Sequence, residues 1–167
     1  MHSDEEMKKI VCDLFSIMYV GWTDEDLLLR PQELRHFTDV VNAKVGRNCN
    51  SNLVCKFLMA KRKDGEGAFG KERVDYTPIL ELELKAAGVP MSFEEFAKKV
   101  VVKVFLRDNP PDEAERLQRY WDRAMKFCEN VRQDMGRAGD VKITDTMVLR
   151  TLIKARKAGW IREATKV

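Results

Sequence analysis

Two clusters of basic residues have the types and spacing to perform a chemical role. Each cluster combines the arginine of a Gly-Arg pair with one basic residue inside the next predicted helix and three in the last turn of that helix. The residues are Arg47, Lys56, Lys61, Arg62 and Lys63 in the first cluster, and Arg137, Arg150, Lys154, Arg156 and Lys157 in the second. Cations in a last helical turn interact favourably with the helix dipole, which accounts for one or two charges per helix. Because each cluster holds more than that, we predict that these side chains contact nucleic-acid phosphates without reading bases. Helix capping and solubility remain the alternative explanation.

Residues for catalysis or metal binding are scarce. The chain has two histidines, His2 and His36. Glu33 and His36 have the Glu-x-x-His spacing of carboxylate-bridged iron sites in helical bundles. Such sites need a second pair, but the matching positions hold Arg123 and Lys126, which would repel a metal. With one internal histidine, no Ser/His/Asp or Cys/His set can be assembled. We therefore predict no catalytic residues, no metal site, no cofactor and no enzymatic activity.

The segments that must position the basic clusters occur twice in the chain. Four identities recur at an offset of 90, and five more recur at an offset of 94 after a four-residue insertion. The pairs are Phe37/Phe127, Val41/Val131, Gly46/Gly136, Arg47/Arg137, Val54/Val148, Leu58/Leu152, Arg62/Arg156, Lys63/Lys157 and Gly65/Gly159. Repeats mostly exist to bury one another's apolar faces, so this duplication is first a feature of architecture. Presenting two like surfaces to a long or two-fold-symmetric partner is the functional alternative.

The spacing of apolar residues predicts helices through most of the chain. Predicted helices of the first repeat are 3–19, a short turn at 23–26, 31–46 and 51–65. Residues 79–87 give a further helix, although their alternating pattern also suits a strand. The β-branched run 100–105 is predicted to be helical because it matches 10–15 of the first repeat. The longest helix is expected at 112–135, the last at 146–157, and a short strand from Trp160.

These elements predict a mostly α fold, with two tandem homologous helical units packed together. The predicted boundaries are 1–65 for the first repeat, 66–91 for a connector with a short helix, and 92–167 for the second repeat with a basic tail. A short hairpin in the connector or the tail is compatible with the pattern. We expect 37–65 and 127–159 to adopt the same fold.

Composition and charge restrict the class of protein. Many charged residues accompany the apolar ones, as in a well-solvated globular protein. No apolar run approaches the ~20 residues of a membrane span, and the N-terminus lacks the pattern of a signal peptide. We therefore expect a cytoplasmic protein with no membrane partner. Residues 141–167 hold seven Lys/Arg against Asp145 and Glu163, so the basic surplus lies in the tail.

The four cysteines are predicted to be structural rather than ligands or disulfide partners. They show no Cys-x-x-Cys spacing, and Cys12, Cys55 and Cys128 fall at apolar-periodic positions. Free cysteine behaves as a small core residue at such places.

Residues 149–161, Leu-Arg-Thr-Leu-Ile-Lys-Ala-Arg-Lys-Ala-Gly-Trp-Ile, resemble the recognition helix of winged helix proteins. In that family the helix ends in glycine and an apolar residue starts the wing. The resemblance implies DNA contact by this helix and a two-stranded wing after residue 160. The sequence departs from the family because it shows no convincing wing there.

Two functional hypotheses follow from the sequence. The first is a non-enzymatic helical protein that binds DNA or RNA phosphates through the two basic helix ends, as a subunit of a larger complex. The second is a protein-interaction or assembly module whose partners meet Trp22, Trp121 and Trp160. Steep salt dependence distinguishes phosphate binding from apolar association.

Overall fold

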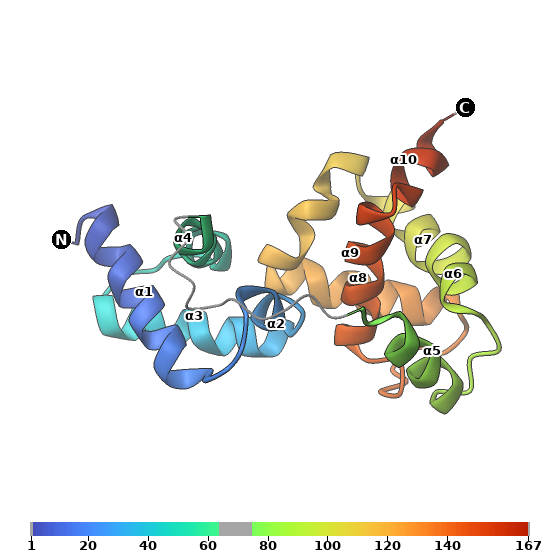
Figure 1. The fold of residues 1–167 in the computed structure, drawn as a ribbon, viewed down its shortest axis with the longest axis horizontal. Helices are drawn as coiled ribbons and strands as arrows, with labels where there is room; N and C mark the ends of the chain where they lie inside the picture. Colours follow the sequence, from blue (N-terminus) through green and yellow to red (C-terminus); the bar gives the residue numbers. More distant parts are fainter. Residues whose placement is uncertain (1, 64–74, 167) are drawn as a thin grey trace. The chain divides into compact units, whose positions relative to one another are not determined.

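The computed structural model describes residues 2–63 and 75–166, with the side chains of 61–63 outside the description (Figure 1). Its regular elements are helical, which confirms the predicted mostly α class. The chain divides into two compact units. The first unit consists of residues 1–73 and 119–121, and the second unit of residues 74–118 and 122–167.

The first unit is built from four helices around one apolar core. They are α1 (Asp4–Met18), α2 (Asp24–Leu28), α3 (Pro31–Val45) and α4 (Ser51–Lys63). Helix α1 packs against both α3 and α4, and α2 contacts the same two helices (Figure 1). The buried core side chains include Val11, Phe15, Leu27, Leu34, Phe37, Val41, Val54 and Leu58. Their helical spacing is the pattern from which these helices were predicted.

Residues 119–121 complete the first unit from a distant part of the sequence. The Ser51 hydroxyl, at the start of α4, donates a hydrogen bond to the carbonyl of Arg119. Trp121 packs against the core of the first unit, and the Arg35 guanidinium lies 4.5 Å from its ring centroid. This segment is therefore integrated into the unit by both a polar and an apolar contact.

The predicted helix over 112–135 is wrong in its first third. The chain instead forms two 3₁₀ turns, η2 (Pro111–Glu115) and η3 (Leu117–Arg119), before α8 (Trp121–Asp134) begins. Two local features oppose a continuous helix here. Proline has no backbone N–H to donate. The Gln118 side-chain amide donates a hydrogen bond to the carbonyl of Glu115 at 2.8 Å. Leu117 and Trp121 share helical spacing, but Leu117 is buried in the second unit, whereas Trp121 is partly buried against the core of the first unit.

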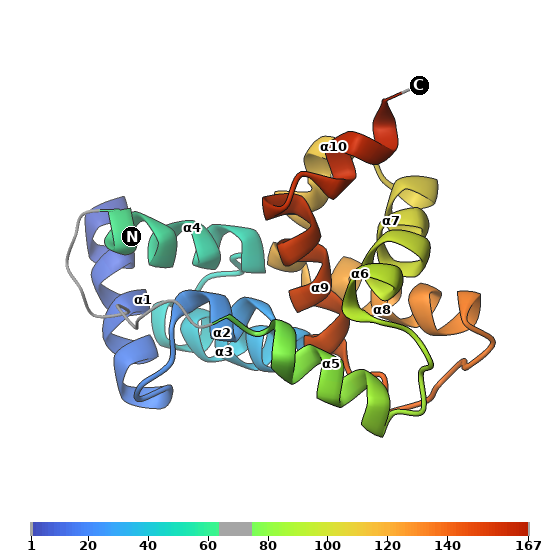
Figure 2. The same cartoon turned by 45° about the vertical axis from the view of Figure 1, so that its right-hand side comes forward.

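The second unit is arranged around α9. Its elements are α5 (Thr77–Ala86), α6 (Phe93–Phe96), the π-helical turn η1 (Ala97–Val101), α7 (Val102–Asp108), η2, most of η3, α8, α9 (Asp145–Lys157) and α10 (Trp160–Thr165). Segments α5, η1, η2 and α10 all pack against α9, and α5 also contacts α6 (Figure 2). The helical prediction for 100–105 is confirmed, and the predicted connector helix belongs to this unit.

The tail is a helix rather than the predicted strand. Gly159 adopts φ 81°, and α10 begins at Trp160, whose ring lies 5.8 Å from that of Phe93. Ile161 is buried, so an apolar residue anchors this helix on its own unit. No strand occurs in ranges 2–63 and 75–166, which excludes a wing or hairpin from the described tail. The connector's glycine-rich part, 64–74, lies outside the described residues.

Both Gly-Arg pairs end a helix in the same way. Gly46 and Gly136 have φ of 66° and 70°. The backbone N–H groups of Arg47 and Arg137 each donate to a carbonyl five residues earlier, at 3.2 and 2.8 Å. This left-handed conformation with its returning hydrogen bond is a common helix end that favours glycine.

Replacing Gly46 with alanine is expected to lower the free energy of unfolding by about 1–2 kcal/mol, the cost of a left-handed conformation for a residue with a Cβ. Space is not the cause, because a Cβ there would meet no atom within 4 Å. Urea denaturation measures the loss. Gly46→Asn is the matched control and should lose less, since asparagine tolerates this conformation. Equal stability of wild type and Gly46→Ala would contradict this assignment.

Candidate nucleic-acid interface

The predicted cations of α9 are largely engaged within the second unit. Lys154 Nζ lies 3.1 Å from Asp75, and Arg156 lies 2.7 Å from Glu115. The backbone N–H of Thr77, followed by its side chain and by Lys154, lowers the pKa of Asp75 to about 2. The low pKa of Asp75 is consistent with its contact to Lys154. A phosphate would have to compete with both carboxylates.

Arg150, also predicted to bind phosphate, has a structural position. It is only 8% exposed, and its guanidinium carbon lies 3.8 Å from the ring centroid of Tyr76. A cation over an aromatic face in a desolvated place stabilises a fold by up to about 2 kcal/mol. The guanidinium holds the start of α5 against α9 rather than facing solvent.

Arg150→Ala is accordingly expected to lower the free energy of unfolding of the second unit by about 2 kcal/mol, through loss of this cation–ring contact. Chemical denaturation measures the loss of stability, and hydrogen exchange of the α5 and α9 amides shows where it occurs. Arg150→Lys keeps a charge and should recover part of the stability. A fully stable Arg150→Ala variant would show that the buried guanidinium contributes nothing to the fold.

Arg137 joins the helix end after α8 to α5. Its Nε donates to Asp140 at 2.9 Å, and its guanidinium also donates to the carbonyl of Ala87. The backbone N–H of Lys142, together with Arg137, lowers the pKa of Asp140. In the second predicted cluster, Lys157 is the residue whose side chain is exposed and makes no ion pair with another described residue.

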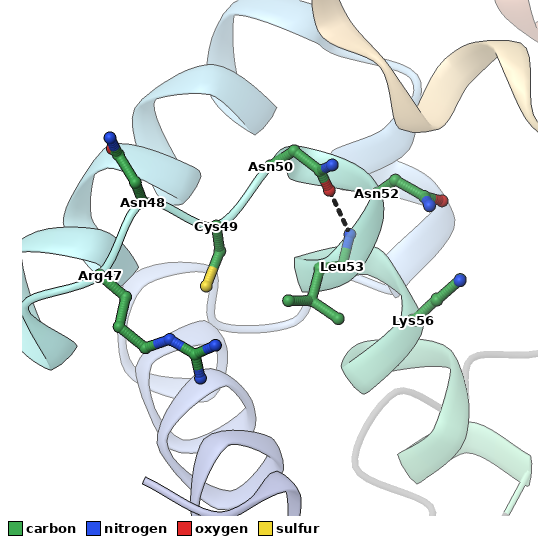
Figure 3. A pocket seen from close by; sticks show the side chains of 7 residues that line it. All are labelled: Arg47, Asn48, Cys49, Asn50, Asn52, Leu53 and Lys56. Atoms are coloured by element: carbon green, nitrogen blue, oxygen red, sulfur yellow. Dashed lines mark hydrogen bonds between the residues drawn. The ribbon is translucent and has the colours of Figure 1, made fainter. Parts of the chain in front are cut away.

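The first cluster differs, because Arg47 and Lys56 both line one open pocket, from its two sides (Figure 3). The pocket has a volume of about 520 Å³ and is called the Arg47 pocket here. It is lined by Arg47, Asn48, Cys49, Asn50, Asn52, Leu53 and Lys56. Both basic side chains are exposed, and neither makes a hydrogen bond or ion pair with another described residue.

Local hydrogen bonds fix the shape of the Arg47 pocket. After Gly46 ends α3, the Asn42 side chain accepts from the backbone N–H of Cys49 at 2.8 Å and donates to its carbonyl at 2.9 Å. The Asn50 side chain then caps α4 by accepting from the N–H of Leu53 at 2.9 Å (Figure 3). Asparagine is among the preferred N-cap residues. The turn between α3 and α4 is therefore held at both ends.

The charge around this turn has one sign. Residues 40–63 include no aspartate or glutamate. Their basic residues are Lys44, Arg47, Lys56, Lys61, Arg62 and Lys63. Helix α4 runs to Lys63, but the side chains of Lys61, Arg62 and Lys63 lie outside the described residues. A surface whose charges are all positive attracts anions.

Sequence spacing did not identify the polar residues that line the pocket with Arg47 and Lys56. The asparagines at 48, 50 and 52 line the pocket and were not predicted to contribute. Two signals in the sequence point to them: asparagine at alternate positions across the start of a helix, and the lack of acidic residues from 40 to 63.

The three tryptophans that were predicted to meet a protein partner each contact a neighbouring cation. Trp22 lies under Arg30 at 4.8 Å, Trp121 under Arg35 at 4.5 Å, and Trp160 under Lys98 at 5.0 Å. Each ring is partly exposed. Partial exposure leaves some apolar area for a partner, but each ring already contacts a cation.

The glutamate of the Glu-x-x-His pair has a partner within the first unit. Glu33, of the Glu-x-x-His pair, accepts a hydrogen bond from the Tyr19 hydroxyl at 3.0 Å. Across residues 2–63 and 75–166, no three His, Cys, Asp or Glu side chains are grouped to hold a metal. Within the same ranges, no helix has the length and apolar character to cross a membrane.

No protein-family model, curated protein or solved structure matches this chain.

Proposed function

We propose that this protein is a non-enzymatic nucleic-acid-binding protein that contacts phosphates mainly through the first unit. The contact surface is the Arg47 pocket together with the basic end of α4. The observation that carries the proposal is that Arg47 and Lys56, both exposed, line one pocket that has no carboxylate among its lining residues. Phosphates are the anions that Lys, Arg and helix N-termini most often bind in nucleic-acid complexes.

The distribution of ion pairs favours the first unit over the second as the unit that binds phosphates. Lys154 and Arg156 face Asp75 and Glu115, whereas Arg47 and Lys56 face no carboxylate within the described residues. Binding a phosphate at α9 would exchange one anion for another, so the gain in free energy would be small. At the Arg47 pocket the phosphate would displace only water and counterions, and counterion release drives association.

We also propose that the chain consists of two tandem homologous units that arose by duplication. Phe15 and Phe37 cross edge to face at 6.0 Å and 78°, and Phe105 and Phe127 do so at 5.9 Å and 88°. Ser3 and Ser92 cap their helices by accepting from an N–H three residues on. These like contacts at matching positions support duplication. In our account the first unit keeps the phosphate surface, while the second uses its cations to hold its own fold.

Salt dependence of binding tests the proposed function. Fluorescence anisotropy with labelled DNA and RNA should show association at ~50 mM salt, and affinity should fall steeply towards ~200 mM because each neutralised phosphate releases counterions. Absence of binding to every nucleic acid at ~50 mM would overturn the proposal. Association with proteins that does not weaken with salt would instead support an assembly module, with no nucleic-acid role.

A further inference from the structure

We infer that residues 119–121 act as a strap: their docking orders the starts of α2 and α4, and their release opens this part of the first unit while the second unit stays folded. The inference is independent of the proposed function. Residues 119–121 belong to the first unit, whereas the residues on either side of them, Gln118 and Asp122, belong to the second. The first unit therefore holds the strap by non-covalent contacts alone.

The polar contacts of the strap are made with the first residues of two helices. Ser51, which begins α4, is 4% exposed, and its hydroxyl donates a hydrogen bond to the carbonyl of Arg119. Asp24, which begins α2, is 1% exposed. Burial raises the pKa of the Cys55 thiol on α4 to about 12, while the charge of Arg119 lowers this pKa and that of Asp24 raises it. Arg119 and Asp24 therefore both lie within electrostatic range of Cys55, inside the first unit.

The apolar contact of the strap is made by Trp121. Its ring packs against the core of the first unit, and the Arg35 guanidinium on α3 lies 4.5 Å from the ring centroid. Tryptophan buries a large apolar area, and a cation over its face adds to the attraction. Trp121 is therefore the anchor of the strap.

Two features favour release of the strap before either core unfolds. Arg119 Nε is enclosed by protein atoms and has no hydrogen-bond partner among the described residues. A buried donor without a partner destabilises the docked state, because water satisfies that donor when the strap is released. The turn that leads into the strap, η3, is a short 3₁₀ helix, whose hydrogen bonds have poorer geometry than those of an α-helix.

Release of the strap removes a tertiary contact from the starts of α2 and α4. The first N–H groups of a helix have no partner within the helix, so a helix start depends on such contacts. Helices α1 and α3 keep the buried contact between Phe15 and Phe37, so the rest of the unit stays folded. Local opening of this kind requires less free energy than global unfolding. It includes Asn52 and Leu53, which line the Arg47 pocket.

Native-state hydrogen exchange of the full chain tests the strap. Ser51→Ala removes the hydroxyl that holds Arg119, and it leaves the cap of α4 in place because Asn50 provides that cap. Hydrogen-bonded amides at the two helix starts should exchange about fivefold faster, as expected for one lost hydrogen bond. These amides are those of Asp26 and Leu29 for α2, and of Leu53 and Val54 for α4. Amides of α9 should exchange as in wild type.

Trp121→Ala removes the anchor and should accelerate the same amides by more than about tenfold, because a large apolar contact is lost. Ser16→Ala is the matched control for Ser51→Ala, since Ser16 is an exposed residue of α1, and it should exchange like wild type. Faster exchange in α4 alone would overturn the inference, because Ser51 would then support only its own helix. Equal acceleration throughout α1 and α3, or wild-type rates in Trp121→Ala, would also overturn it.

Discussion

Reversing two charges in the first unit, with Arg47→Glu/Lys56→Glu, should lower nucleic-acid affinity by about two orders of magnitude at ~100 mM salt. Phosphate contacts act together, so removing several and adding repulsion changes affinity far more than a single surface mutation changes stability. Both side chains are exposed and unpaired within the described residues, so the fold should be retained. Anisotropy titration gives the affinity, and circular dichroism checks helix content.

The second unit offers a control with the same change in net charge. Lys154→Glu/Arg156→Glu reverses two cations that lie beside Asp75 and Glu115. Because those carboxylates already offset the cations, we expect the affinity to fall by no more than about tenfold. The sequence alone favoured the opposite order, since the basic surplus lies in residues 141–167. A larger loss from the second-unit variant would support that order and contradict the role given to the Arg47 pocket.

Phe37→Ala should produce the largest loss of stability that a single substitution causes in the first unit. Phe37 is 0% exposed, and its ring contacts those of Phe15 and Tyr19 at 6.0 and 5.7 Å. Truncating a buried phenylalanine typically costs about 3–5 kcal/mol, from lost burial and the cavity left behind. Because the chain has two units, hydrogen exchange of amides in α1 and α3 measures the effect more specifically than a single unfolding midpoint.

Ile17→Ala provides the control, since Ile17 is 74% exposed. It should change the free energy of unfolding by less than about 0.5 kcal/mol, as surface substitutions usually do. Exchange rates in Phe37→Ala equal to those in Ile17→Ala would show that the core of the first unit is not centred on the three aromatic rings.

The sequence predicted most of the fold because each helix carries its own local signals. Met7, Val11 and Phe15 recur every four residues on α1 and are all buried. Ser3 caps this helix and Gly46 ends α3 in a left-handed conformation. Such signals depend on neighbours within a few residues, so they can be recognised without a structure.

The errors arose where distant residues decide the conformation. The spacing of Leu117 and Trp121 suggested one continuous helix, yet Leu117 lies in the second unit and Trp121 packs on the first. Trp160 has the preference of a strand residue, but its packing on Phe93 and the helix start at Gly159 place it in α10. Periodicity within a segment cannot report which core each of its residues joins.

The same limit applies to the candidate site. The carboxylates that face Lys154 and Arg156 lie 79 and 41 residues away in the chain. Nothing in the spacing of the basic residues could distinguish these engaged cations from Arg47 and Lys56. The sequence could identify the basic residues of both clusters, but tertiary contacts decide which of them remain available for a phosphate.

Amide chemical shifts during titration with an oligonucleotide test the central claim most directly. In ¹⁵N spectra of the whole chain, the account predicts that the largest shifts occur at residues 46–56, around the Arg47 pocket, and that they diminish as salt is raised. Largest shifts within residues 141–166, with 46–56 unperturbed, would contradict it and assign phosphate binding to the second unit.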